Sequence, residues 1–154
     1  MQGNKKVVAS LNEILKNELT AINQYFLHAK LCENWGIEKL AEHIRSESID
    51  EMKHADVLIE RIIFLEGSPN IQGLGKLQIG ADVARILNND LGLEEKALPD
   101  LRKAIACCEE SADYGSRELL ADILESEEEH VDWLEAQLEL IEKVGLQNYI
   151  QKMI

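Results

Sequence analysis

Two Glu-x-x-His sequences contain the side chains of this chain that are best suited to bind metal ions. They are Glu51-Met52-Lys53-His54 and Glu127-Glu128-Glu129-His130. Residues three apart lie on the same face of a helix, so each sequence presents a carboxylate and an imidazole to one side. A single Glu-x-x-His is common on helices and is usually solvated, so one copy alone indicates little.

Each Glu-x-x-His is preceded at the same distance by another glutamate. Glu18 precedes Glu51 by the same interval that separates Glu94 from Glu127. The whole triplet therefore recurs once along the chain with a constant offset, as a weak internal repeat. The candidate ligands are Glu18, Glu51, His54, Glu94, Glu127 and His130. Carboxylates with a few imidazoles suit iron or manganese better than a closed zinc site.

Four long helices are the elements that must bring these side chains together. Apolar residues recur with a helical period nearly throughout, no alternating strand is evident, and the only prolines are Pro69 and Pro99. We expect helices over about 5–34, 37–66, 81–111 and 113–144, followed by a short helix over 146–153. Pro99 lies inside the third helix and is expected to kink it.

The segment between the second and third helices is too long for a tight turn. It contains Gly73, Gly75 and Gly80 and has no helical period. It suits a crossover that runs the length of the bundle. Two helical hairpins joined by one long crossover form the ferritin-like topology, whose known di-iron ligand pattern is the one found here. We therefore expect residues 1–154 to form a single all-α, ferritin-like four-helix bundle with a short C-terminal fifth helix.

The expected turns are correctly placed to align the ligands. Gly36 lies midway along the sequence between Glu18 and His54, so antiparallel helices that meet there place these two side chains at one level. The same relation holds for Glu94 and His130 about a turn near 112–113. All six candidate ligands are then expected to face one point inside the bundle.

Acidic residues and histidines interrupt the apolar stripe of every long helix near its middle. In the third helix, Val83 and Leu87 are followed by Asp90 and Glu94 before apolar residues resume at Ala97. An ionised carboxylate in a bundle core is costly unless another group compensates it. Only two histidines and no lysine lie on these stripes. The pattern therefore predicts bound metal cations.

Composition argues against several other kinds of partner. The net charge of −13 disfavours nucleic acid and anionic membranes and favours cations. No apolar stretch approaches the roughly 20 residues of a membrane span, and the N-terminus does not resemble a signal sequence. The three cysteines, Cys32, Cys107 and Cys108, are a poor framework for disulfides or thiolate-bound metal. We expect a cytoplasmic protein.

Long strings of residues allow a more specific comparison. They occupy 17–19, 21–29, 48–56, 59–62, 64–67, 74–77, 127–130, 133–135 and 145–149, and include Ser48-Ile49-Asp50-Glu51-Met52-Lys53-His54-Ala55-Asp56. Through these strings the chain resembles the bacterioferritins over essentially its full length. The resemblance implies iron storage and detoxification in a hollow shell of twenty-four subunits. It also implies ferroxidase activity, in which oxygen or hydrogen peroxide oxidises ferrous iron and ferric mineral is stored.

The same resemblance implies roles for particular residues. The six candidate ligands would form a di-iron ferroxidase site within each subunit, with Glu51 and Glu127 bridging the two metals. Met52 from two symmetry-related subunits would bind the iron of one shared haem b, in a pocket lined by Leu19, Asn23 and Phe26. A bacterioferritin-associated ferredoxin would be the partner for iron release.

Without the resemblance, Met52 has a simpler interpretation. With Ile49, Ile59 and Ile63 it forms a second apolar seam on a helix that is already buried on one side. A second seam of this kind is typical of a subunit interface, and methionine is a common filler there.

The chain departs from the family at two positions. Arg45 and Ser46 stand where many members have a tyrosine and a histidine, and that histidine helps some members to bind iron on the inner surface. Glu47 and Asp50 remain as candidate ligands on that surface. Tyr25, on the ligand stripe, is either redox-active or a core residue whose hydroxyl bonds a ligand carboxylate.

Two other functions compete with iron storage. A di-iron oxidase or oxygenase subunit would share the ligand pattern, but 154 residues leave little sequence for a substrate pocket. A miniature ferritin that protects DNA would build its metal site between subunits and would need positive charge. An inert bundle leaves the buried carboxylates unexplained. The sequence leaves open whether the shell is a homopolymer or contains a second subunit type.

Overall fold

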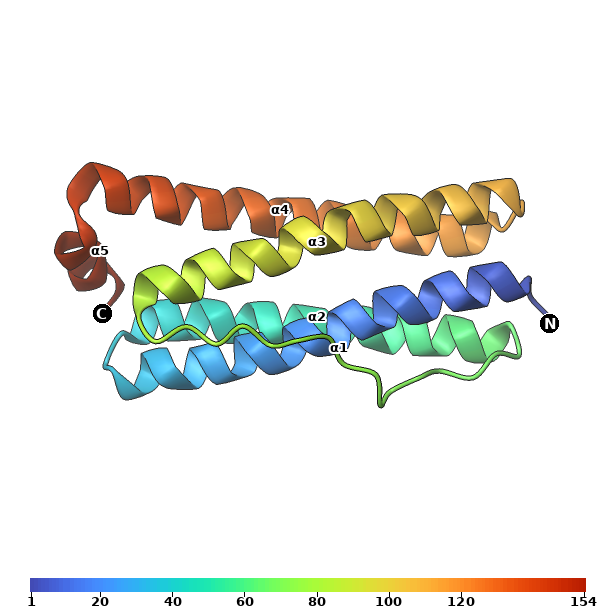
Figure 1. The fold of residues 1–154 in the computed structure, drawn as a ribbon, viewed down its shortest axis with the longest axis horizontal. Coiled ribbons are helices and arrows are strands. Elements are labelled where there is room, and N and C mark those ends of the chain that lie inside the picture. The colour runs from blue at the N-terminus through green and yellow to red at the C-terminus, as the bar shows by residue number, and fades with distance from the viewer.

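Five helices and no strands make up the computed structural model, which describes residues 1–154. The helices are α1 (Lys5–Asn34), α2 (Glu38–Phe64), α3 (Val83–Glu110), α4 (Tyr114–Val144) and α5 (Leu146–Met153). Figure 1 shows α1 to α4 lying side by side along the long axis, with the short α5 across one end. The expected ferritin-like bundle of two hairpins, one crossover and a fifth helix is confirmed.

Three of the helices end in the same way. The residues that follow α1, α2 and α3 in the left-handed conformation are Gly36, Glu66 and Ala112, with φ of 81°, 60° and 55°. In each case the next residue donates its N–H to a carbonyl five residues earlier, at 2.9 Å. This hydrogen bond closes the helix and turns the chain sharply. Each hairpin therefore has a short, well-defined turn.

α1 and α5 begin and end where expected, whereas the bounds of α2 and α3 and the start of α4 differ by one or two residues, and capping explains part of the difference. The side chain of Asp82 accepts the N–H of Arg85 at 2.9 Å, and that of Asp113 accepts the N–H of Ser116 at 3.0 Å. Both aspartates are therefore caps that precede α3 and α4. Periodicity alone had placed Asp113 inside the fourth helix.

The crossover between α2 and α3 is fastened to α1 by a row of polar side chains. Thr20, Gln24 and His28 are spaced four residues apart on α1. They accept the backbone N–H groups of Gly75, Gln78 and Gly80 at 2.8, 3.0 and 3.0 Å, respectively. Figure 1 shows this segment, in green, running along α1 and α2 back to the start of α3. The crossover thus spans the bundle as expected.

The hydrophobic core is divided into two clusters. A cluster of 14 buried residues includes Tyr25, Leu134 and Tyr149 and lies toward the α5 end. The other, with 13 buried residues, includes Leu11 and Leu120 and lies toward the N-terminus. Buried polar residues of all four long helices separate these clusters. Packing on both sides therefore fixes the helices around a polar layer. No helix has a stretch long and apolar enough to span a lipid bilayer.

Gly80 is required where the crossover meets α3. A Cβ at this position would lie 2.5 Å from the backbone nitrogen of Ile86, which cannot move as a flexible side chain could. We expect Gly80→Ala to lower the free energy of unfolding by about 1–3 kcal/mol, as overpacking does. Urea-induced unfolding followed by circular dichroism measures the change.

The matched control is Gly92→Ala on α3, where a Cβ would meet nothing within 4 Å. Because alanine favours helix, this variant should be stabilised by up to about 1 kcal/mol. Equal stability of the two variants would contradict the steric explanation.

Candidate metal centre

All six candidate ligands meet in the polar layer at the middle of the bundle. Glu18 comes from α1, Glu51 and His54 from α2, Glu94 from α3, and Glu127 and His130 from α4. Two groups of their ligand atoms could each hold a metal ion, with all atoms of a group within 4.8 Å of one another. Both groups contain Glu51 and Glu127. The geometry therefore suits two neighbouring ions that share two carboxylates.

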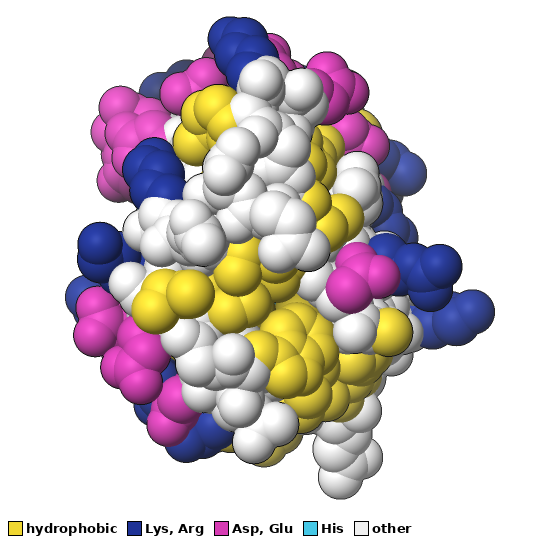
Figure 2. Space-filling view, turned by 90° about the vertical axis from the view of Figure 1, so that its left-hand side faces the viewer, with side chains coloured by type: hydrophobic (Ala, Val, Ile, Leu, Met, Phe, Trp, Pro, Cys, Tyr) yellow, Lys and Arg dark blue, Asp and Glu magenta, His cyan; other side chains and the backbone are white.

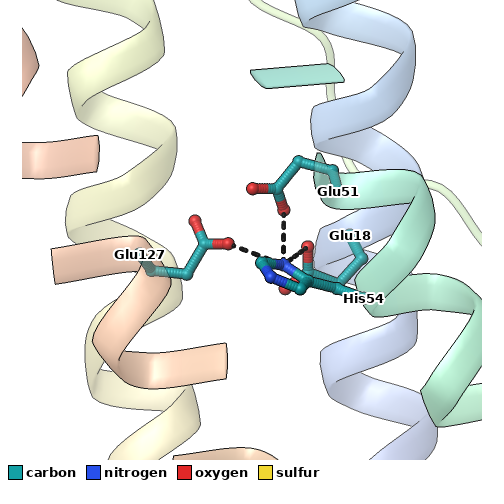
Figure 3. Close-up of side chains that lie close together, drawn as sticks. All are labelled: Glu18, Glu51, His54 and Glu127. Carbon is teal, nitrogen blue, oxygen red and sulfur yellow. Dashed lines mark ion pairs between the residues drawn. The ribbon is translucent and has the colours of Figure 1, made fainter. Parts of the chain in front are cut away.

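The first group is arranged around His54. Its Nδ1 lies 3.1 Å from Glu127 Oε1, 3.5 Å from Glu18 Oε2 and 3.7 Å from Glu51 Oε2. Figure 3 shows the three carboxylates converging on this ring nitrogen. Carboxylates around a single imidazole nitrogen give it more acceptors than its one proton can serve. A cation would satisfy all of them at once.

The second group is arranged around His130. Its Nδ1 lies 3.4 Å from Glu94 Oε1. Glu51 and Glu127 complete the group, and all four residues are buried. Each histidine therefore directs its Nδ1 toward the first glutamate of its own triplet, His54 toward Glu18 and His130 toward Glu94.

Unsatisfied polar atoms are concentrated at this centre. Seven buried side-chain nitrogen or oxygen atoms have no hydrogen-bond partner. Six of the seven belong to the candidate ligands: Glu18 Oε2, His54 Nδ1, Glu94 Oε2, both carboxylate oxygens of Glu127, and His130 Nδ1. The ion-pair distances above are short, but these contacts are not directed as hydrogen bonds. Buried groups normally find partners, so a donor set of this kind fits bound metal ions.

Burial changes the charge state of these side chains. It raises the pKa of Glu18, of Glu127 and, most strongly, of Glu94, where the charge of Glu127 adds to the effect. Burial alone would lower the pKa of His54, but its contacts with Glu127 and Glu18 outweigh burial and raise it to about 10. Without metal, the centre therefore binds protons in place of cations.

Tyr25 lies directly beside the centre. Its hydroxyl donates a hydrogen bond to Glu94 Oε1. The tyrosine ring meets the His130 ring edge-on at 5.2 Å, with an interplanar angle of 86°. Burial and then the charges of Glu94 and Asp90 raise the pKa of Tyr25 well above its usual range, so the phenol keeps its proton. The hydrogen bond from this hydroxyl to a carboxylate of the centre, one of the two expected possibilities, is present.

A buried hydrogen-bond network was not foreseen. Asp90 Oδ1 accepts from Gln24 Nε2 at 2.9 Å and contacts His28 Nδ1 at 2.7 Å. Because His28 Nε2 accepts the N–H of Gly80, the proton of this ring is on Nδ1 and is donated to Asp90. The network links the crossover to α3 one turn before Glu94. The four-residue spacing from Gln24 to His28 could have indicated it.

A second group, in which only Glu47 was expected as a candidate ligand, lies on the side of the centre between α2 and α4. Glu47 Oε2 is 3.7 Å from His130 Nδ1, and Glu47 Oε1 is 3.2 Å from His43 Nε2. The ring of His43 stacks on that of Trp133 at 3.6 Å. Burial raises the pKa of Glu47, but the imidazoles of His43 and His130 outweigh it, and the net pKa is lowered. The spacing of four residues between His43 and Glu47 was the available signal.

The apolar seam on α2 is exposed in the single chain. Met52 and Ile49 are each 43% exposed, and Ile63 and Phe26 are also exposed. Ile59 is half-buried and packs against the core. The seam around Met52 is therefore accessible to another molecule, while the six metal ligands lie on the opposite, inward side of the same helix and its neighbours.

Two antiparallel hairpins around a carboxylate-lined centre define a ferritin-like protein, and the ferritin-like domain family matches residues 8–144. The chain is 48% identical to a bacterioferritin of Mycobacterium tuberculosis over 149 residues, which are 97% of this chain and 94% of that protein. It is 45% identical to a bacterial ferritin of Synechocystis over 155 residues, covering 100% and 99% of the two chains.

A bacterioferritin of Mycolicibacterium paratuberculosis is 47% identical over 149 residues, with 97% of this chain and 94% of the relative covered. The chain therefore belongs to the bacterioferritin family, whose members store iron. The resemblance inferred from the strings of residues is confirmed.

Metal binding should release protons, because the metal-free centre holds them. At neutral pH, His54 with a pKa of about 10 is protonated and must lose its proton before Nδ1 can bind a cation. The affinity for Co(II) should therefore rise with pH, by roughly tenfold per pH unit for each proton displaced. Titration of the metal-free protein in weakly buffered solution, with a pH indicator, measures the release. An affinity that is independent of pH, with no protons released, would contradict this account.

Proposed function

We propose that this protein is a ferroxidase that stores iron, with Glu18, Glu51, His54, Glu94, Glu127 and His130 as ligands of two iron ions. The observation that carries the proposal is the meeting of the six ligands in two groups that share Glu51 and Glu127. Six buried atoms of the ligands other than Glu51 have no hydrogen-bond partner there. The membership of the chain in an iron-storing family supports it. Ferrous iron is the substrate of the centre.

The chemistry follows from the charge of the ligand set. Two ferrous ions give up one electron each, which reduces oxygen with two protons to hydrogen peroxide, or hydrogen peroxide with two protons to water. Four carboxylates stabilise the ferric state more than the ferrous state, because the higher charge gains more from negative ligands. The carboxylates thus favour oxidation. The ferric iron then either moves to the cavity as mineral or stays at the centre and passes electrons inward.

A neighbouring side chain orients one ligand, and the ligands themselves exchange protons for metal ions. Tyr25 donates to Glu94 and fixes the orientation of that carboxylate. His54, with a pKa of about 10, holds a proton in the metal-free centre and loses it when iron binds. Burial and the charge of Glu127 raise the pKa of Glu94 and so favour its protonated form. Burial of the ligands excludes bulk water, which strengthens their electrostatic effect.

We also propose that the subunits assemble into a shell of twenty-four copies that encloses the mineral, with or without a second subunit type. Exposed apolar side chains support assembly. Figure 2 shows hydrophobic side chains gathered at the end of the bundle that carries α5. Among the exposed hydrophobic residues at this end are Trp35, Val144 and Ile154. Such residues, together with the seam around Met52, are typical of buried subunit contacts.

The donor chemistry of the α2 seam fits haem b. The Met52 thioether is accessible, and the exposed Ile49 and Phe26 offer apolar surface to a porphyrin. Leu19 and Asn23 would line the same pocket. Met52 of this chain and Met52 of a second copy would together hold the haem iron. A haem bound there provides one-electron transfer.

The remaining parts of the proposal concern partner and location. A bacterioferritin-associated ferredoxin would be the electron donor for iron release, and the cytoplasm would be the compartment. The acidic character of the chain, with a net charge of −13, argues against a DNA-protecting role and favours the collection of cations. A di-iron oxidase remains the second candidate, because it would use the same six ligands.

Iron oxidation tests the proposal directly. Ferrous iron is added aerobically to the metal-free protein, and ferric absorbance is followed. We expect oxidation to continue far beyond two irons per chain with a soluble product. Glu18→Ala should slow the initial phase by more than about 10-fold, because it removes a ligand. Glu13→Ala, which removes an exposed carboxylate on the same helix, should oxidise iron at the rate of the unaltered protein.

The outcomes separate the candidate functions. Oxidation that stops near two irons per chain would favour a di-iron oxidase over storage. A rate equal to that of buffer alone would contradict both. Binding of DNA that weakens with added salt would favour the miniature-ferritin function.

Haem binding depends on Met52 in this proposal. Met52→Leu keeps the apolar side chain but removes the sulfur ligand, so the haem content of the purified protein should fall at least about tenfold. The pyridine haemochrome spectrum measures haem per chain. Lys53→Gln, an exposed neighbour, serves as the control. Retention of haem by Met52→Leu would show that another residue ligates it.

A further inference from the structure

Arg45 places a positive charge at one end of the apolar seam on α2. It precedes Ile49 by four residues and Met52 by seven, so the three side chains share one face of the helix. Seven residues are two helical turns, which separate Arg45 from Met52 by about 10 Å along the helix axis. The exposed seam therefore has an apolar centre around Met52 and a cationic end.

Phe26 of α1 holds the guanidinium group of Arg45 at the rim of the seam. The Cζ atom of Arg45 lies 5.7 Å from the centroid of the Phe26 ring. The attraction between a cation and an aromatic ring favours this position of the arginine side chain. Phe26 is itself 44% exposed, as much as Ile49 and Met52 are. One exposed surface thus combines a thioether, apolar side chains and a guanidinium group.

Arg45 is only loosely paired with a carboxylate of its own chain. Its single ion pair joins Nη2 to Glu33 Oε2 at 3.5 Å, and both side chains are partly exposed. By contrast, the pair between Arg61 and Asp113 measures 2.9 Å. Strong charge-assisted hydrogen bonds are about 2.7–2.9 Å long. Arg45 therefore retains donors for another carboxylate.

The chemistry of haem b matches this combination of side chains. The macrocycle is apolar, its iron takes an axial ligand, and two propionate carboxylates extend from one edge. Carboxylates that lie in a subunit contact need cationic partners. The planar guanidinium of arginine fits a carboxylate with two parallel hydrogen bonds. Lys53 follows Met52 directly, but its side chain is 74% exposed and lies 4.0 Å from Asp50.

We propose that Arg45 binds a propionate of the haem that Met52 ligates, exchanging Glu33 for that carboxylate. This role rests on the proposed haem site. Many members of the family have an uncharged tyrosine at this position, so the charge distinguishes this chain from them. A cation near the haem disfavours the additional positive charge of ferric iron. Arg45 should therefore also raise the reduction potential of the haem.

Haem b and its dimethyl ester separate propionate pairing from apolar packing, because the ester has no charged carboxylate. The purified, haem-free protein is titrated with each compound, and binding is followed by the Soret absorbance. Arg45→Gln should bind haem b about fivefold more weakly than the unaltered protein, as expected for the loss of an ion pair. It should bind the ester as well as the unaltered protein does.

Two further variants control this titration. Arg45→Lys keeps the charge without the planar donors, so its affinity for haem b should lie between those of Arg45→Gln and the unaltered protein. Arg102→Gln removes an exposed guanidinium from α3, away from the seam, and should bind haem b as the unaltered protein does.

The reduction potential of the bound haem is an independent measurement. In an anaerobic redox titration, the potential should be lower in Arg45→Gln than in the unaltered protein, because the cation that favours ferrous haem is missing. Arg102→Gln should leave the potential unchanged.

The outcomes separate the role of Arg45 from the haem site itself. Equal haem affinities and equal potentials of Arg45→Gln and the unaltered protein would overturn the role of Arg45 and leave the haem site intact. Equal weakening of haem b and ester binding would show that Arg45 acts through its packing on Phe26, and would also overturn this role. Absence of haem binding by the unaltered protein would contradict both the proposed haem site and this inference.

Discussion

The buried negative charge at the middle of the bundle is the constraint on which the rest of the structure depends. Four carboxylates from four helices are held at one level, where few hydrogen bonds are available to them. Like charges in a poorly solvated site repel one another unless protons or cations are present. The two hydrophobic clusters on either side supply the packing that keeps the helices together across this layer. The fold thus stabilises an arrangement that its own side chains disfavour.

Much of the fold could be predicted because the two sets of ligands are spaced alike about their turns. In each hairpin the first glutamate and the histidine lie equally far from the turn, so the pairing of the two helices follows from the spacing. The helix boundaries were less accurate, since Asp82 and Asp113 act through local capping and not through periodicity. The attachment of the crossover was also missed. Thr20, Gln24 and His28 look like surface residues until the segment that covers them is in place.

The same reasoning explains which parts of the site could be foreseen. The six residues of the repeat are brought together because their spacing places them at the same height along the bundle axis. His43, Glu47 and Trp133 belong to no repeat, and their contacts depend on how closely α2 and α4 approach each other. Sequence spacing within a hairpin does not specify that separation, because α2 and α4 belong to different hairpins. The assignment of individual ligands to individual irons stays a prediction, as does the haem ligand Met52.

The row of acceptors on α1 has a consequence for the evolution of the crossover. Thr20, Gln24 and His28 bind backbone N–H groups, which every residue except proline possesses. The side chains of the crossover can therefore drift in evolution while the attachment persists, provided that proline does not arise at the three donor positions. The exposed Ile71, Leu74 and Leu77 lie in this segment. The exposed side chains of the crossover can thus change during evolution while the packing of the four helices beneath it stays the same.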